Sequence, residues 1–327
     1  MSNEIGESQV RYYALARQAL VQALQLAQIG NGDNVLIPAL ICKDVVASVH
    51  TVGATPIFYE VDENLAPLEF AKFLNFKAAI AVNYFGFPQD LKIFKQQCEL
   101  VGASLIEDNA HGYLSQDSSG QHLGTRSNFG IVSIRKTLRI ADGAQLLIND
   151  NNIKSLPSQL TFTQLSPGLR PVLQRFLVET QQTIHLPLLD WARSLVRIGR
   201  KLLTGKALPI SPPSAEFEKI ILCAPRESSM KRITQLDEHA EVERRRTLYV
   251  KVESVLTKCE VSPIFSSLPH GCVPYGYPFY ASTSNAKSAG LLVKHLGVEV
   301  IHWPDLPESV VDLAPKHYKD IWLVNFL

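Results

Sequence analysis

The sequence has no apolar run long enough to cross a lipid bilayer, which takes about 20 consecutive apolar residues. Its first residues, MSNEIGESQVRYY, also lack the basic segment and apolar core that mark a secretory signal. We therefore expect a soluble, cytoplasmic protein with no membrane insertion.

An excess of charge of one sign is missing as well. The chain has 32 Lys and Arg against 31 Asp and Glu, a net charge of +1. Proteins that bind nucleic acid through its phosphates usually carry a basic patch, so we expect no nucleic-acid partner. The densest basic run, at 244–246, follows glutamates at 238, 241 and 243, and this pattern predicts a solvated helix face.

Cysteines are few and are not arranged in pairs. None of the five forms a C-x-x-C motif, so neither a zinc site nor a redox pair is indicated, and we expect reduced thiols and no metal. A complete dinucleotide fingerprint is missing too. Gly30-Asn31-Gly32 lacks the third glycine of G-x-G-x-x-G and follows a predicted helix, which argues against a nicotinamide enzyme.

Helical and strand patterns alternate along the first 134 residues, and this alternation indicates the fold class. The strands are nearly continuous apolar runs, which favours an α/β fold with a mostly parallel sheet covered on both faces. The predicted helices are 11–29, 42–52, 67–74 and 89–101, and the predicted strands are 34–39, 56–62, 78–86, 103–110 and 129–134.

The chain is long enough for one large domain and a smaller one. We predict a large α/β domain over residues 1–215 and a small C-terminal α+β domain over 216–327. The large domain includes a Leu-, Arg- and Gln-rich helical segment, 151–215, which could form an interface or a lid. Predicted helices lie at 169–183, 187–204, 231–256 and 288–297, and predicted strands at 273–282 and 298–304.

Polar residues gather where two strands of the predicted sheet end. Ligands of parallel sheets bind at the carboxyl ends of strands, so these residues are expected to meet at one edge. A carboxylate from one strand and a hydroxyl-plus-amine cluster from the next would form a cofactor site. The candidates are Glu107, Asp108 and His111 in SLIEDNAHGY, and Ser133, Arg135 and Lys136 in FGIVSIRKTLRIADG.

These motifs carry a resemblance to a known family. Residues 12–62, AVNYFGFPQDL, SLIEDNAHGY and GTRSNFGIVSIRKTLRIADGAQLLIND resemble the DegT/DnrJ/EryC1/StrS aminotransferases. The tail YGYPFYAS…LGVEVIHWP resembles them more weakly, and 151–215 does so poorly. The resemblance implies a fold type I aminotransferase-like protein that binds pyridoxal 5'-phosphate, in a family whose members mostly aminate nucleotide-linked sugars.

The resemblance assigns expected roles around the cofactor ring. Asp108 matches the aspartate that keeps the pyridine nitrogen protonated, so that the ring can accept electrons. Alternatively, Asp108 only caps the turn after its strand. His111 stands where the family usually has glutamine, near the phenolic oxygen, and either side chain can donate a hydrogen bond there. Cys42 falls near the position of a side chain over the ring, although both His111 and Cys42 could simply be packed.

At the phosphate end, Ser133 matches the serine that holds the cofactor phosphate. The first helix should add its backbone N–H groups. The family's usual Ser-Gly-Thr turn is replaced here by Leu15-Ala16-Arg17-Gln18, so Ala16, Arg17 and Gln18 are the candidate contacts. Arg17 could supply charge to the phosphate, or it could be a helix-surface residue.

The expected Schiff-base lysine is displaced. The family usually has lysine five residues after the serine, a position held here by Leu138, whereas Lys136 is only three residues on. A shorter loop could bring Lys136 to the same point, as in a subset of the family that resembles S-[LI]-R-K-T-L. Alternatively, Arg135 and Lys136 face the phosphate or the solvent and no Schiff base forms.

Two functions therefore remain open. The first is a pyridoxal-phosphate aminotransferase that takes an amino group from an amino acid and gives it to a keto-sugar carried by a nucleotide. The second is a degenerate member that lacks transamination and serves as a ligand-binding or assembly protein.

The resemblance also implies a homodimer in which the partner chain contributes an asparagine to the phosphate. The corresponding stretch, 224–230, reads APRESSM and has no asparagine.

Overall fold

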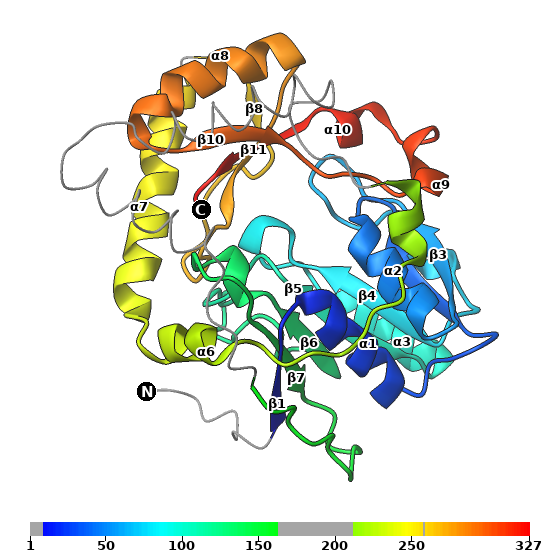
Figure 1. Cartoon of the computed structure of the whole chain (residues 1–327). Coiled ribbons are helices and arrows are strands. Elements are labelled where there is room, and N and C mark those ends of the chain that lie inside the picture. The colour runs from blue at the N-terminus through cyan, green and yellow to red at the C-terminus, as the bar shows by residue number, and fades with distance from the viewer. Residues whose placement is uncertain (1–8, 163–211, 258) are drawn as a thin grey trace.

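The computed structural model describes residues 9–162, 212–257 and 259–327, so the predicted helices at 169–183 and 187–204 lie outside the described residues. A seven-stranded sheet has the order β1-β7-β6-β5-β4-β2-β3, and a four-stranded sheet has the order β10-β11-β9-β8. The two sheets occupy different parts of the molecule, with the long helix α7 (Glu238–Leu256) running alongside both (Figure 1). The predicted fold type I architecture is confirmed.

The centre of the large sheet is parallel, and its strands are buried apolar runs. All five residues of β4 are buried, because helices cover both faces. Only β7 and β1, at one edge, run antiparallel to their neighbours. The strands are β1 (Val10–Tyr13), β2 (Asn34–Pro38), β3 (Thr55–Tyr59), β4 (Ala78–Val82), β5 (Ser104–Asn109), β6 (Phe129–Val132) and β7 (Ala144–Ile148); the helices are α1 (Ala16–Leu26), α2 (Lys43–Thr51) and α3 (Lys92–Val101).

The first predicted helix, 11–29, is wrong at its start. Residues 10–13 form β1, which pairs with β7 so that Tyr13 lies opposite Ala144. Aromatic residues favour such a half-buried edge. The helix begins only at Ala16, and the side chain of Gln18 accepts a hydrogen bond from the N–H of Leu15 at 2.9 Å.

Two other predicted helices differ from the structure. Within 67–74 only a 3-10 turn forms, at Phe70–Lys72. The predicted helix 231–256 is two helices, α6 (Glu227–Thr234) and α7. The break falls at Asp237, whose carboxylate accepts a hydrogen bond from the N–H of Ala240 at 3.0 Å and so starts α7.

The small sheet is antiparallel, and its strands come from the C-terminal part of the chain. α8 (Thr283–Val293) begins five residues before the predicted start at 288, because the hydroxyl of Ser282 caps it. The strands are β8 (Ser262–Pro263), β9 (Gly276–Tyr280), β10 (Glu299–His302) and β11 (Ile321–Asn325), and the short helices α9 (Glu308–Val311) and α10 (Lys316–Lys319) lie between β10 and β11.

The segment just beyond residue 215 packs on the large sheet's helices. Ile220 contacts Val21 of α1 and Ala47 of α2, and the carbonyl of Ile221 accepts a hydrogen bond from Gln18 at 2.7 Å. The first residues after the predicted domain boundary therefore cover the large part of the molecule before the chain reaches α6.

The basic run of α7 is not a solvated face. Arg244 is 45% exposed, but Arg245 is 1% exposed and Arg246 donates to the carbonyls of Pro269 and Cys272 at 2.8 and 2.6 Å. The prediction is wrong for Arg245 and Arg246 because backbone carbonyls of distant loops, invisible in the local pattern, accept their hydrogen bonds.

None of the described helices is both long and apolar enough to span a membrane. All five cysteines are free, and the described residues hold no cluster of metal-ligating side chains.

Candidate functional site

Strand β5 sends its two adjacent carboxylates to opposite faces of the sheet, because side chains alternate along a strand. Glu107 is fully buried and pairs with Arg126, with Oε1 2.6 Å from Nη2. Asp108 points the other way and lines a pocket together with Ser133 and Lys136, which follow the neighbouring strand β6. The carboxyl ends of β5 and β6 thus build the site that the sequence predicts.

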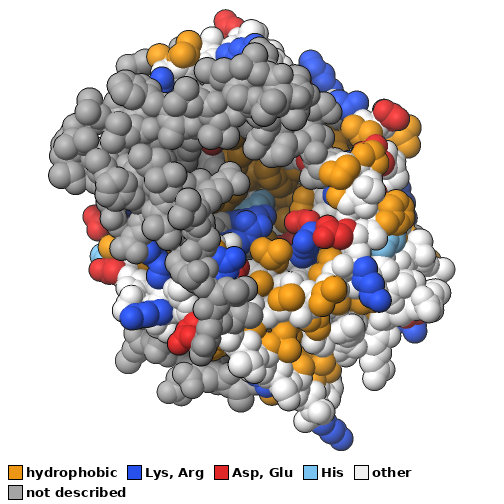
Figure 2. Space-filling view, viewed as in Figure 1, with side chains coloured by type: hydrophobic (Ala, Val, Ile, Leu, Met, Phe, Trp, Pro, Cys, Tyr) orange, Lys and Arg blue, Asp and Glu red, His pale blue; other side chains and the backbone are white. Residues whose placement is uncertain are grey.

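This pocket brings together seven of the nine predicted site residues. It encloses about 460 Å³ of empty space, including its open mouth. In the face shown in Figure 2, a hollow has Lys and Arg side chains at its floor and hydrophobic side chains beside it. The seven residues are Ala16, Arg17, Cys42, Asp108, Ser133, Arg135 and Lys136.

Asp108 both caps a turn and presents a carboxylate to the pocket. Its Oδ1 accepts the N–H of Ala110 at 2.9 Å, and no described residue donates to its Oδ2. Burial raises the pKa of Asp108, and the nearby charge of Lys136 offsets this only in part. A cationic donor in the pocket would therefore stabilise the ionised carboxylate.

The local turn decides which side chain after Ser133 enters the pocket. Residues Ile134–Lys136 form a 3-10 turn, and Lys136 lines the pocket. Leu138, at the position where the family usually has lysine, packs instead against the apolar cluster of Val132, Ile134 and Leu147. The tighter turn thus places an amine in the pocket two residues earlier in the chain.

His111 contacts the amine of Lys136 directly, with Nε2 3.2 Å from Nζ. On the other side of the ring, Nδ1 accepts the N–H of Phe85 at 3.3 Å. Burial, and then the charge of Lys136, holds the pKa of His111 well below its usual value, so the ring is neutral. With Nδ1 accepting, the single ring proton lies on Nε2, which can donate to Lys136 in its free-amine form.

Aromatic rings fix the position of His111. Tyr275 stacks on it with ring centroids 4.6 Å apart and an angle of 4°. Phe85 lies parallel at 5.8 Å, and Trp303 meets the ring edge-on at 5.7 Å. Tyr275 and Trp303 come from the C-terminal part of the chain, and sequence reasoning missed them because no local motif marks a ring that packs on a distant histidine.

The phosphate end of the pocket has an unsatisfied hydroxyl. Ser133 is 1% exposed, and its Oγ has no hydrogen-bond partner. Ala16 and Arg17, at the start of α1, line the same pocket, where helix N–H groups favour an anion. Gln18 is placed elsewhere: its side chain binds the backbone of Leu15 and Ile221.

Arg17 is held by two carboxylates. Its Nη1 lies 3.2 Å from Asp44 and 3.1 Å from Glu218, while its Nε is buried without a partner. Glu218 lies 201 residues away in sequence, which explains why this pairing escaped the sequence analysis. Cys42, at the start of α2, lines the pocket, and burial raises the pKa of its thiol.

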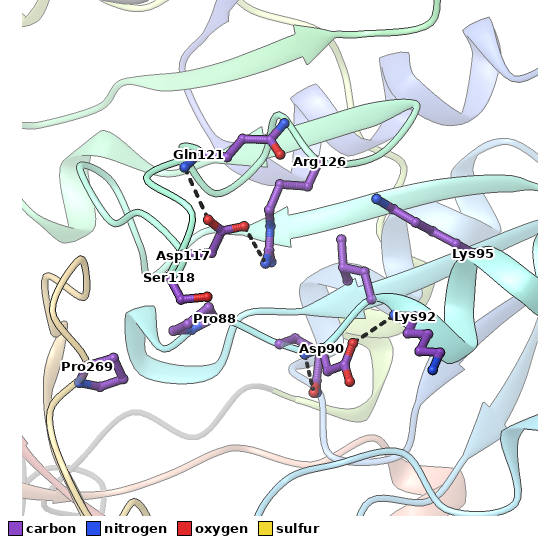
Figure 3. Close-up of a pocket in the computed structure, with 11 residues that line it drawn as sticks. Pro88, Asp90, Lys92, Lys95, Asp117, Ser118, Gln121, Arg126 and Pro269 are labelled. Carbon is purple, nitrogen blue, oxygen red and sulfur yellow. Dashed lines mark hydrogen bonds and ion pairs between the residues drawn. The ribbon is translucent and has the colours of Figure 1, made fainter.

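A second, larger hollow, with about 1090 Å³ of empty space including its open mouth, belongs to the opposite side of β5, where Arg126 lies (Figure 3). Arg126 is already paired with Glu107 and lies 3.6 Å from Asp117. The two lysines that line this second hollow, Lys92 and Lys95, are exposed on α3. This hollow lacks the buried amine, carboxylate and hydroxyl that meet in the Lys136 pocket, so the Lys136 pocket is the better candidate for chemistry.

The Lys136 pocket fits pyridoxal phosphate in its chemistry. Asp108 offers a free carboxylate oxygen for a protonated ring nitrogen, Lys136 offers an amine for the aldehyde, and Ser133 offers an unpartnered hydroxyl for the phosphate. The start of α1 adds the positive end of a helix. The Ser133 hydroxyl is the strongest indication of a ligand here, because a buried polar group without a hydrogen-bond partner destabilises the fold.

Comparison with known proteins gives a family match for the part of the chain that carries the pocket residues. Residues 13–166 match the model of the DegT/DnrJ/EryC1/StrS aminotransferase family, so the predicted resemblance is confirmed over that part of the chain, and pyridoxal phosphate is the cofactor of that family.

Solved structures share the fold at low sequence identity. The aminotransferase TlmJ from Streptoalloteichus hindustanus is 20% identical, with a TM-score of 0.64 over 98% of this chain and 81% of that one. The putative sugar aminotransferase Spr1654 from Streptococcus pneumoniae (PMP-form) is 15% identical, with a TM-score of 0.63 over 97% and 82%. DesV from S. venezuelae is 16% identical, with a TM-score of 0.62 over 97% and 79%.

Proposed function

We propose that this chain, whose residues 13–166 match the DegT/DnrJ/EryC1/StrS aminotransferases, is a pyridoxal-phosphate-dependent aminotransferase. It takes an amino group from an amino acid, glutamate or glutamine, and gives it to a keto-sugar carried by a nucleotide. The observation that carries the proposal is the meeting of the Lys136 amine, the Asp108 carboxylate and the unpartnered Ser133 hydroxyl in one pocket.

When bound, pyridoxal phosphate supplies a ring that accepts electrons from the substrate's Cα–H bond. Lys136 is the residue that takes the proton from Cα and returns it, because its Nζ is the amine in the pocket. His111 positions this Nζ, which lies 3.2 Å from its Nε2. Asp108 keeps the ring nitrogen protonated, and Ser133 with the start of α1 binds the phosphate.

The proposal includes a homodimer. Phe217 and Ile221 are 73% and 72% exposed on the segment that crosses α1 and α2, beside the residues that line the pocket. Large exposed apolar side chains are typical of surfaces that a partner covers.

The test is direct. Purified protein incubated with pyridoxal phosphate should absorb visible light, and borohydride followed by peptide mapping should place a stable pyridoxyl group on Lys136. Glutamate or glutamine should then convert the visible band to that of the aminated cofactor. Absence of colour and of an adduct on every lysine would contradict the proposal.

A non-catalytic role is the second candidate, and one observation favours it. Asp44 and Glu218 already bind the guanidinium of Arg17, so less of its charge is left for a phosphate than a free arginine would offer. In that case the protein would bind a nucleotide sugar, measured by calorimetry, without forming an adduct at Lys136.

Replacing Ser133 by alanine should weaken pyridoxal-phosphate binding by about tenfold to a hundredfold, the effect of one hydrogen bond to a charged group. The cofactor-free protein should keep its unfolding temperature, because the hydroxyl of Ser133 has no partner to lose. Ser115 is the matched control: it is equally buried, but its Oγ bonds to the backbone of Val273. Ser115→Ala should lower the unfolding temperature and leave cofactor affinity unchanged, and the reverse pattern would contradict the assignment.

A further inference from the structure

Arg245, in α7, is a buried cation that holds three segments together. Its Nη2 donates to the carbonyl of Thr137 at 2.6 Å, and its Nη1 donates to the carbonyls of Pro274 and Tyr275, each at 3.1 Å. Its Nε donates to Glu241 at 2.7 Å, which balances the charge. The side chain is 1% exposed, so all of these bonds are shielded from water.

One branch of this network reaches the backbone of the lysine turn. Thr137 directly follows Lys136 at the end of the 3-10 turn Ile134–Lys136, and it is 3% exposed. The bond from Arg245 to the carbonyl of Thr137 therefore holds the Thr137–Leu138 peptide, at the end of the turn that carries Lys136.

A second branch reaches the amine itself. Arg245 holds the backbone of Tyr275, whose ring stacks on His111 at 4.6 Å. The Nε2 of His111 lies 3.2 Å from the Nζ of Lys136. The N–H of Tyr275 also donates to the carbonyl of Phe85 at 2.8 Å, and the N–H of Phe85 donates to Nδ1 of His111. The backbone of Tyr275 is therefore linked to His111 through Phe85 as well as through the ring stack.

We propose that Arg245 is a positioning residue that orients the Lys136 amine, through Thr137 on one side and through Tyr275 and His111 on the other. The inference rests on the proposed function in giving Lys136 its chemical role. An arginine suits this task because its planar fork reaches acceptors in several directions at once. A lysine has all its donors on one atom and cannot bond to Thr137 and to the 274–275 peptide in the same way.

Neighbouring Arg244 provides a matched control. It shares Glu241 with Arg245, but it is half-exposed, and it also donates to the carbonyl of Phe326, away from the lysine turn. Arg244→Lys and Arg245→Lys therefore make the same chemical change one residue apart on one helix. Only the second removes the fork that holds the lysine turn.

The experiment measures Lys136 in two ways. Cofactor-free protein is acetylated with a water-soluble succinimidyl ester between pH 6 and 10, and the rate at Lys136 is compared with that at exposed Lys95 in the same sample by peptide mapping. Separately, the rate of borohydride-stable adduct formation with pyridoxal phosphate is followed at Lys136. Circular dichroism establishes that each variant is folded.

Arg245→Lys should slow adduct formation at Lys136 by about tenfold to a hundredfold, the effect expected when a reacting group is misplaced by about an ångström. It should also shift the pH dependence of Lys136 acetylation while leaving Lys95 unchanged. Arg244→Lys should match the wild type in both assays. A folded Arg245→Lys protein with wild-type rates and pH dependence overturns the inference.

If Arg245→Lys does not fold, two variants of Tyr275 test the inference instead. Tyr275→Leu removes the stack on His111 but keeps the guanidinium, and it should shift the pH dependence of Lys136 acetylation; Tyr275→Phe, which keeps a ring, should restore it. Equal profiles for the two Tyr275 variants overturn the inference. Failure of the wild type to form an adduct while its acetylation follows these expectations would count against the proposed function alone.

Discussion

Replacing Lys136 by alanine should lower the rate of transamination by about a thousandfold or more, since the variant loses the group that moves the proton. The borohydride-stable adduct should vanish from this position, while the cofactor-free protein remains folded, because Lys136 lies in a pocket and not in the apolar core. Activity assays with an amino-acid donor and peptide mapping check both results. Retained colour with an adduct on another lysine would show that the amine is misassigned.

The sharper form of this test adds a lysine at residue 138 in the Lys136→Ala background. Leu138 packs against Val132, Ile134 and Leu147, so a lysine placed there starts from an apolar cluster and not from the pocket. We expect the Leu138→Lys change to restore neither adduct nor activity and to lower the unfolding temperature. Restoration would mean that the chain after Ser133 can rearrange to the spacing usual in the family.

Replacing Asp108 by asparagine should act in opposite directions on catalysis and on stability. With cofactor, the rate should fall by about a hundredfold or more, because the ring nitrogen loses its charged partner. Without cofactor, the protein should become more stable at neutral pH, because a buried carboxylate whose pKa is raised by burial is no longer ionised there. Asparagine can still accept the N–H of Ala110, so the turn stays capped.

The pH dependence of this gain has a definite sign. The pKa of Asp108 is higher in the folded protein than in the unfolded chain. The folded wild-type protein is therefore most stable when Asp108 is protonated, and it loses this stability as the pH rises through the pKa of the folded state. The extra stability of Asp108→Asn should therefore appear with rising pH and disappear near or below about pH 4, the unperturbed range of an aspartate.

Asp62 supplies the control for this pair of measurements. It too follows a strand and accepts backbone N–H groups, from Asn64 and Ala66, but it does not line the pocket. Asp62→Asn should leave cofactor affinity and rate unchanged. If Asp108→Asn behaves like Asp62→Asn in the cofactor assays, Asp108 is a turn cap and nothing more.

The strand ends could be predicted from the sequence because they depend on local patterns. An apolar run followed by Glu107-Asp108 fixes where β5 ends, and the period-2 alternation then sends only one of these carboxylates to the pocket. The meeting of Asp108 with Ser133 and Lys136 follows from the parallel order of β5 and β6. Helix starts were harder: Tyr12 and Tyr13 join an edge strand whose partner, β7, lies more than a hundred residues later.

The details that decide the chemistry depend on distant contacts. Whether residue 136 or residue 138 faces the pocket depends on the 3-10 turn and on the apolar cluster against which Leu138 packs. The number of residues after Ser133 predicts neither the turn nor the cluster. The partners of Arg17 and Arg245 are likewise far along the chain, so a helix-surface pattern looks the same whether water or a backbone carbonyl accepts the hydrogen bonds.

The network around Arg245 also sets an order in time. During synthesis the chain emerges from its N-terminus, and N-terminal parts begin to fold first. Lys136 and His111 are made well before the residues that hold them, Arg245 and Tyr275. A nascent chain that stops short of α7 therefore already carries the amine, the carboxylate and the hydroxyl, but it lacks their support. The supports of the site are therefore complete only after Tyr275 has been made, and we expect cofactor binding to follow that point.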